Sequence, residues 1–141
     1  MTLIANLYRD DDSGFAYVSL PAIGPYSPAG FECYRSELWG SAALKRRGAT
    51  FLPQLREHDL FVPPGDFPRF RCELQMVASN ARGIAGEIWP RGWIATYCPV
   101  RRSGRLRRYE IRGARDIRTY VFRFRYLLNV AEQHNLGFTI G

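Results

Sequence analysis

Two short runs of largely apolar, strand-like residues near the N-terminus predict a first pair of strands. Thr2–Arg9 and Phe15–Leu20 are rich in strand-forming residues, and the acidic stretch 10–14 between them consists of turn-forming Asp, Ser and Gly. The pattern predicts a β-hairpin with a five-residue loop. Asp10, Asp12 and Gly14 are weakly similar to the start of a calcium-binding loop, but the later ligands and the closing glutamate of that motif are missing. A solvated acidic turn is therefore the prediction.

Helix signals begin after an irregular, proline-rich connection over residues 21–30. Ser36 is a suitable N-cap, Lys45–Arg47 suit the negative end of a helix dipole, and Gly48 favours a left-handed stop. The resulting first helix would present Leu38, Trp39, Ala42 and Ala43. Residues 49–55 are apolar but broken by a proline, and Asp59–Val62 predicts a brief strand.

A second helix is predicted from the regular spacing of apolar residues after Asp66. Asp66 can cap this helix and Pro68 lies in its first turn. The apolar positions recur every three or four residues, which predicts one buried stripe formed by Phe70, Leu74, Val77, Ala81 and Ile84. Glu73 and Asn80 flank the stripe, where polar side chains usually bond a neighbouring loop.

The pattern changes after Pro90. Trp93–Cys98 and Leu106–Ile111 are strand-like and are separated by a turn over 99–104, so they predict a second hairpin with a basic tip.

A third helix is predicted to follow from an Asp116 cap. One of its sides would be apolar and would contain Ile117, Tyr120, Val121, Phe124, Leu127, Leu128 and Ala131. Residues 120–126 also alternate with a period of two, which leaves a strand as the alternative. The helix is favoured because residues 127–134 continue the helical period and residues 135–137 make a good stop. Residues 138–140 would then form a closing strand.

These elements predict a single α+β domain over residues 1–141, with an antiparallel sheet of hairpins and about three helices. The 141 residues are 46% hydrophobic and 14% aromatic, which is enough for a core without disulfides or metal. No apolar run approaches the length of a membrane span, and the N-terminus lacks the features of a signal peptide. We therefore expect a cytoplasmic protein with no membrane partner.

Positive charge is concentrated in one window of the chain. Eleven of the nineteen arginines lie between Arg91 and Arg125, with only Glu110 and Asp116 as acids, so this window has a net charge of +9. The other 106 residues have nine basic and eleven acidic side chains. Such asymmetry predicts attraction to acidic surfaces or phosphates. The basic residues are nineteen arginines and one lysine, Lys45. Arginine can form two hydrogen bonds at once with a carboxylate or phosphate, which favours specific docking. A GC-rich genome would also explain the high ratio of arginine to lysine.

Two groups of residues in this window predict a partner-binding surface. The tip of the second hairpin has five arginines that Glu110 alone cannot neutralise: Arg101, Arg102, Arg105, Arg107 and Arg108. On the third helix, Phe122, Arg125 and Tyr126 are predicted to turn outward with Asn129, and exposed aromatic and arginine side chains are common at interface hot spots. The alternatives are that the hairpin charges are merely solvated and that Phe122 and Tyr126 cover a second face of the sheet.

Residues for catalysis, metal binding or a cofactor do not form a pattern in this sequence. Cys33, Cys72 and Cys98 are widely spaced, so we expect small buried side chains in a reducing compartment, with a reactive Cys98 as the alternative. His58 and His134 lie far from any catalytic motif, and His134 would cap a helix end. No nucleotide-binding, hydrolase or metalloprotease motif occurs. The prediction is a protein without catalytic residues, metal or cofactor.

Two stretches resemble small bacterial immunity proteins that neutralise toxins of polymorphic or contact-dependent systems. The first is Glu37-Leu38-Trp39-Gly40-Ser41 through Gly48 and Phe51-Leu52-Pro53, and the second is the ending 127–137. Together with the strand and long helix between them, the resemblance covers about two thirds of the chain. It implies a cytoplasmic α+β protein that blocks a toxin domain by occlusion. This chain is basic, which implies an acidic target surface.

Two classes of partner therefore compete. In the first, the arginines dock on the acidic surface of a protein such as a toxin domain. In the second, the hairpin follows the phosphates of a nucleic acid while Phe122 and Tyr126 stack on bases. No nucleic-acid-binding signature accompanies the basic segment, so the protein partner is the favoured hypothesis.

Overall fold

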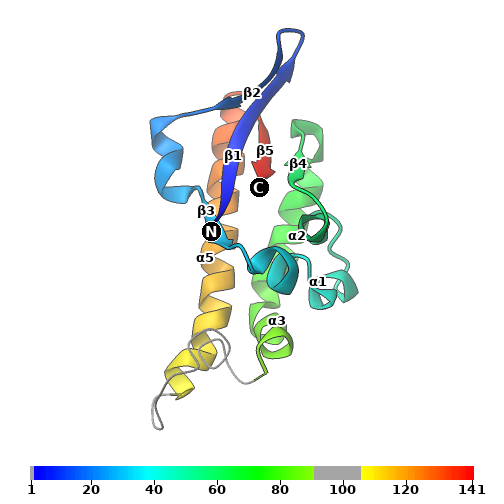
Figure 1. The fold of residues 1–141 in the computed structure, drawn as a ribbon, viewed down its shortest axis with the longest axis vertical. Coiled ribbons are helices and arrows are strands. Elements are labelled where there is room, and N and C mark those ends of the chain that lie inside the picture. Colours follow the sequence, from blue (N-terminus) through cyan, green and yellow to red (C-terminus); the bar gives the residue numbers. More distant parts are fainter. Residues whose placement is uncertain (1, 91–105) are drawn as a thin grey trace.

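The protein is an α+β fold built on one antiparallel sheet (Figure 1). The fold is known from a computed structural model that describes residues 2–90 and 106–141, without the side chains of residues 106–112. The sheet has the order β2-β1-β5-β4, and β3 also pairs with β1. Its strands are β1 (Thr2–Asp11), β2 (Gly14–Val18), β3 (Pro28–Phe31), β4 (Leu60–Val62) and β5 (Gly137–Ile140). The predicted fold class is confirmed.

The helices lie on one side of this sheet. The α-helices in the described residues are α1 (Ala42–Arg46), α2 (Phe67–Ser79), α3 (Ala81–Ile88) and α5 (Leu106–Gln133). Short 3-10 turns η1 (Pro21–Tyr26), η3 (Leu52–Arg56) and η4 (Pro64–Asp66) and the π-helical turn η2 (Arg35–Trp39) connect them. Phe138 of β5 contacts Phe70 of α2 and Phe124 of α5, with ring centroids 5.6 and 5.8 Å apart. Helices α2 and α5 therefore cover the same face of the sheet.

The first hairpin is confirmed, but its loop is shorter than predicted. Pairing of β1 with β2 continues to Asp11 and Gly14, so the turn contains two residues, Asp12 and Ser13, instead of five. Gly14 has a φ of 108°, and the Asp11 carboxylate accepts a hydrogen bond from the Ser13 amide at 2.9 Å. A left-handed glycine and a local aspartate bond close the turn tightly. The hairpin projects beyond the rest of the molecule (Figure 1).

The connection over residues 21–30 is more regular than predicted. It contains η1 and the strand β3, in which Gly30 pairs with Leu3 of β1. Gly30 has a φ of 123°, and a Cβ at this position would lie 2.5 Å from the ring of Tyr34. The absence of a side chain lets the buried Tyr34 ring pack directly on this strand.

The first predicted helix is two separate turns. The helix is interrupted between η2 and α1 at Gly40. A Cβ at this position would lie 2.6 Å from the Arg35 carbonyl oxygen and 2.7 Å from Cβ of Arg56. The N-cap of α1 is Ser41 and not Ser36, because the Ser41 hydroxyl accepts a bond from the Leu44 amide at 3.4 Å. Ala42 is exposed, contrary to prediction. The stop at Gly48 is confirmed by its φ of 88°.

The second predicted helix has the expected buried stripe but is divided in two. Phe70, Leu74, Val77, Ala81 and Ile84 are all fully buried. Helix α2 ends at Asn80, whose side-chain amide donates to the Met76 carbonyl at 2.8 Å, and α3 follows at once. The side chain of Asp66 makes no capping hydrogen bond, so its predicted role is wrong.

Helix α5 is much longer than predicted. It starts at Leu106, so the predicted returning strand Leu106–Ile111 is wrong and Asp116 lies inside the helix. Buried Ala114 and Ile117 continue the apolar row of the C-terminal half toward the N-terminus, which favours one continuous helix. Residues 119–126 are helical, as favoured from the sequence. The other predicted elements of the second hairpin, residues 93–98 and 99–104, lie outside the described residues.

The end of α5 agrees with the sequence. Asn135 adopts a left-handed φ of 52°, and the Leu136 amide donates to the Ala131 carbonyl at 2.8 Å. The chain then enters β5, which pairs with both β1 and β4. The predicted stop and closing strand are confirmed.

Candidate protein-binding surface on helix α5

One side of α5 is buried and fixes which residues face solvent. Its core row is fully or almost fully buried and contains Ala114, Ile117, Val121, Phe124, Leu127, Leu128 and Ala131. The Phe124 ring lies 5.5 Å from the Trp39 ring, between centroids, and Tyr34 donates a hydrogen bond to Asp116 at 3.3 Å. The helix is therefore held in one rotation about its axis, and the opposite row is presented outward.

The outward row combines three arginines with one large ring. Arg115, Arg118, Phe122 and Arg125 are all exposed, and the Phe122 side chain is 62% exposed. Their spacing of three, four and three residues places them along one side of the helix over about 15 Å. We call these four residues the α5 stripe.

Among the described side chains, the arginines of the α5 stripe differ from most other arginines in having no acidic partner. Elsewhere Arg35 pairs with Asp59 at 3.0 Å, Arg47 with Glu87 at 2.6 Å, and Arg71 with Glu132 at 2.7 Å. None of the ion pairs among the described side chains involves Arg115, Arg118 or Arg125. The stripe is consequently a surface of uncompensated positive charge around an apolar ring.

Aromatic packing on one flank of the stripe holds Tyr126 in place. Its ring stacks on Tyr26 of η1 with centroids 3.8 Å apart, while Phe122 lies 6.5 Å from the same ring. Arg123 lies over the Tyr120 ring at 5.4 Å and donates to the Pro28 carbonyl at 3.3 Å. Arg123 and Tyr126 thus attach η1 and β3 to the helix, whereas Phe122 remains available to a partner.

Tyr120 lies beside the stripe and is partly buried. Burial raises the pKa of its hydroxyl, nearby Asp116 raises it further, and Arg123 opposes the shift. The Tyr120 hydroxyl is therefore neutral at physiological pH, and its ring serves as a packing surface for Arg123.

The structure brings together only some of the residues predicted from the sequence. Phe122 and Arg125 are exposed neighbours, as predicted, and Tyr126 is half-buried against η1, so neither ring covers a second face of the sheet. Arg107 and Arg108 belong to α5 and not to a hairpin. Arg101, Arg102 and Arg105 lie outside the described residues. Sequence reasoning missed Arg115 and Arg118, although their helical spacing to Phe122 was a usable signal.

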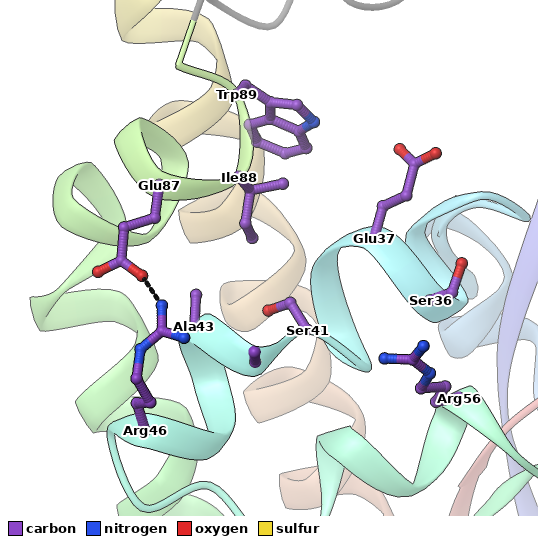
Figure 2. Close-up of a pocket in the computed structure, with 10 residues that line it drawn as sticks. Ser36, Glu37, Ser41, Ala43, Arg46, Arg56, Glu87, Ile88 and Trp89 are labelled. Atoms are coloured by element: carbon purple, nitrogen blue, oxygen red, sulfur yellow. Dashed lines mark hydrogen bonds and ion pairs between the residues drawn. The ribbon is translucent and has the colours of Figure 1, made fainter.

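A pocket of about 410 Å³ lies between η2, α1 and the end of α3 (Figure 2). Its lining mixes Ser36, Glu37, Ser41, Arg46, Arg56 and Glu87 with the edge of Trp89. Arg46 and Arg47 both bind the Glu87 carboxylate, and the Ser41 hydroxyl is used as a helix cap. Within this described lining, no serine has a histidine or carboxylate partner that would make it a nucleophile, so the pocket provides no basis for a catalytic hypothesis.

The remaining chemical groups of the described residues give no second candidate for a functional site. No set of three or more His, Cys, Asp or Glu side chains there could hold a metal ion. No helix within residues 2–90 and 106–141 is long and apolar enough to cross a bilayer. Cys33 is half-buried and Cys72 is exposed, so burial of Cys72 was predicted wrongly, and Cys98 lies outside the described part. His58 and His134 are both exposed.

Comparison with known proteins adds no relative. No protein family, curated protein or solved structure matches this chain.

Proposed function

We propose that the protein binds an acidic surface of another protein through the α5 stripe. The observation that carries this proposal is the lack of acidic partners, among the described residues, for three exposed arginines placed around an exposed phenyl ring. Guanidinium groups form two parallel hydrogen bonds with carboxylates, and the ring can fill an apolar pocket between them. Because α5 is rigidly packed, little ordering is needed on this side of the complex.

The kind of partner that we propose is a bacterial toxin domain. The resemblance of residues 37–53 and 127–137 to immunity proteins supports this choice. In that function the protein would act in the cytoplasm, without a cofactor or a catalytic step, by occluding the toxin. The net charge of +9 between Arg91 and Arg125 would accelerate the encounter with an acidic target.

Nucleic-acid binding through the same stripe is the alternative hypothesis. A surface that binds single-stranded nucleic acid usually needs several exposed aromatic rings on which successive bases stack. Tyr126 has its ring against Tyr26, at 3.8 Å between centroids, which leaves Phe122 as the well-exposed ring of the α5 stripe. This arrangement favours a protein partner over a nucleic acid.

The test compares charge reversals at and away from the stripe. The variant R118E/R125E and the matched control R82E, which changes an exposed arginine of α3, are immobilised beside the unchanged protein in lysate of the native host. We expect the unchanged protein and R82E to capture the same partner protein. The purified partner should bind R118E/R125E at least about tenfold more weakly than it binds the unchanged protein. Thermal unfolding should be nearly identical for all three.

Growth rescue and the salt dependence of binding decide between the two partner classes. If the captured protein is a toxin, co-expression of the unchanged chain should restore growth of cells producing that toxin, and co-expression of R118E/R125E should not. Equal capture by all three proteins would contradict the role of the α5 stripe. Capture of nucleic acid alone, with affinity falling steeply with salt, would support the alternative hypothesis.

A further inference from the structure

The face of the sheet opposite α2 and α5 carries a cluster of aromatic side chains. The strand register puts Tyr8, Phe15, Tyr17 and Phe61 on this outer face, across β2, β1 and β4. Phe15, Tyr17 and Phe61 are 50%, 60% and 43% exposed, although side chains of this kind are usually buried. We call these four residues the aromatic face. It belongs to strands that are far apart in the sequence and is distinct from the α5 stripe.

Mutual contacts hold the rings of the aromatic face in one arrangement. The Tyr8 ring stacks on Phe15 with centroids 5.4 Å apart and meets Phe61 edge to face at 5.5 Å. Phe15 also contacts Tyr17 at 5.2 Å. Because the rings are already ordered, a partner that covers them gains apolar burial without the cost of fixing their rotamers.

A groove whose lining contains two aspartates and one arginine of β1 runs beside this cluster. It has a volume of about 390 Å³ and lies between the projecting part of β1, the prolines after β4 and the turn before β5. Its lining includes Tyr8, Arg9, Asp10, Asp11, Pro63, Pro64 and His134. Arg9 pairs with Asp11 at 3.7 Å, so the net negative charge of the groove comes from Asp10. Burial raises the pKa of the Tyr8 hydroxyl, and Asp10 and then Asp66 raise it further, so both carboxylates lie close enough to act on this ring.

Two open strand edges accompany the groove. Pairing of β1 with β5 ends at Tyr8 and Gly137, so no strand of residues 2–90 or 106–141 pairs with residues 9–11 of β1 on that side. Strand β2 is the edge of the sheet, and all its residues except Val18 are exposed. Open edges present backbone donors and acceptors that an extended peptide can pair with.

We propose that the aromatic face and its groove bind an extended, basic segment of a partner protein. Arginine or lysine side chains of this segment would lie between Asp10 and the aromatic rings, where carboxylate attraction and cation–π contact act together. Its backbone would pair with one of the open edges, and alternate apolar side chains would cover Phe15 and Phe61. The charge of the site favours such an occupant, since the exposed Asp10 and the neighbouring Asp12 form no ion pair among the described residues, whereas Arg9 is balanced by Asp11.

The same charges disfavour other occupants. Asp10 and Asp12, which form no ion pair among the described residues, would repel the phosphates of a nucleic acid or of anionic lipids. Two copies of the protein that met face to face through this surface would bring these carboxylates together, which opposes a symmetric dimer.

The experiment selects short random peptides displayed on phage against the full chain in about 0.15 M salt. Counter-selection uses F15A/Y17A, in which two exposed rings are removed and folding is checked by thermal unfolding. We expect the enriched peptides to combine Arg or Lys with apolar residues. One enriched peptide, titrated into the labelled protein, should shift the amide resonances of residues 7–18 and 60–62 and leave those of α5 unchanged.

Substitutions separate the role of charge from that of the rings. D10N should weaken binding of the enriched peptide about fivefold or more, whereas E57Q, which removes the same charge from an exposed site outside the groove, should not. Binding to R118E/R125E should be unchanged, so that failure here and failure of the α5 stripe are distinguishable. Enrichment of acidic peptides, no enrichment over F15A/Y17A, or self-association that F15A/Y17A abolishes would each overturn the proposal.

Discussion

The ring of Tyr8 lies directly over Gly137, on the neighbouring strand of the sheet. A Cβ at position 137 would be 2.2 Å from Cζ of the tyrosine and 2.4 Å from Cε1, so any side chain there would displace the ring. Tyr8 and Gly137 are paired in the β1–β5 ladder. This missing side chain lets Tyr8 extend across β5 and meet Phe61 of β4.

Replacing Gly137 with alanine should therefore cost about 1–3 kcal/mol of stability, since the Tyr8 ring is held by Phe15 and Phe61 and cannot move freely. Chemical denaturation would measure the loss. The matched control is G86A on α3, where an added Cβ meets nothing within 4 Å. That substitution should stabilise the protein by up to about 1 kcal/mol, because alanine is the better helix former. Equal effects at the two positions would contradict the close contact.

A buried carboxylate joins α2 to the chain before η3. Glu73 is 7% exposed and accepts hydrogen bonds from the amides of Thr50, Phe51 and Leu52 at 2.6, 2.9 and 2.8 Å. E73Q should lose about 1–3 kcal/mol, since an amide group cannot accept all these bonds and brings donors that have no partner there. E132Q, which removes an exposed partner of Arg71, should change the free energy of unfolding by less than about 1 kcal/mol. Denaturant titrations of both variants give the comparison.

Local periodicity explains what could be predicted from the sequence. The buried rows of α2 and α5 and the turn at Asn135 depend on neighbouring residues, so spacing alone located them. The same spacing placed Phe122 and Arg125 on the outer side of a helix. It also contained Arg115 and Arg118. Arg115 was overlooked because the helix was expected to start only at Asp116, whereas Arg118 lies inside the expected helix, four residues before Phe122, and its spacing was not used.

Contacts between distant segments explain what could not be predicted. The break at Gly40 depends on Arg56, and the role of Glu73 depends on amides 21 to 23 residues earlier in the chain. The aromatic face joins Tyr8 and Phe15 to Phe61 only because β4 and β1 both pair with β5. No local pattern encodes such a register.

The ion pairs of Glu87 should make stability depend on pH. Hydrogen bonds from Arg47 and then Arg46 lower the pKa of this carboxyl below its ordinary value of 4.5. The folded state then binds fewer protons than the unfolded state between the two pKa values. The contribution to stability is present above pH 4.5 and is lost as the pH falls through the lowered value.

Comparing the unchanged protein with E87Q across pH tests this contribution. The difference in melting temperature should be largest near neutral pH, shrink below the ordinary carboxyl pKa and disappear in stronger acid. Added salt should also reduce it, because the pairs are exposed. E57Q, which removes an exposed carboxylate that forms no ion pair within the described part of the chain, should show no such trend. A difference that stayed constant with pH would contradict the electrostatic explanation.

Substitutions of Tyr126 and Phe122 on α5 should separate effects on stability from effects on binding. Y126A removes a half-buried ring that stacks on Tyr26 at 3.8 Å, and should cost about 1–3 kcal/mol from lost burial and ring stacking. F122A removes a ring that is 62% exposed, and should change stability by less than about 1 kcal/mol while weakening the binding of an acidic partner. Thermal unfolding measures the first effect and titration calorimetry with the captured partner the second.

A double-mutant cycle between Tyr26 and Tyr126 makes the contrast quantitative. If stacking between these rings is what fixes η1 on α5, Y26A and Y126A should each destabilise the protein, and the double variant should lose less than the sum of the two. The corresponding cycle between Tyr26 and Phe122 should show a smaller coupling, since their centroids are 6.5 Å apart and tilted. A larger coupling to Phe122 would mean that this ring is structural, and the α5 stripe would lose its apolar anchor.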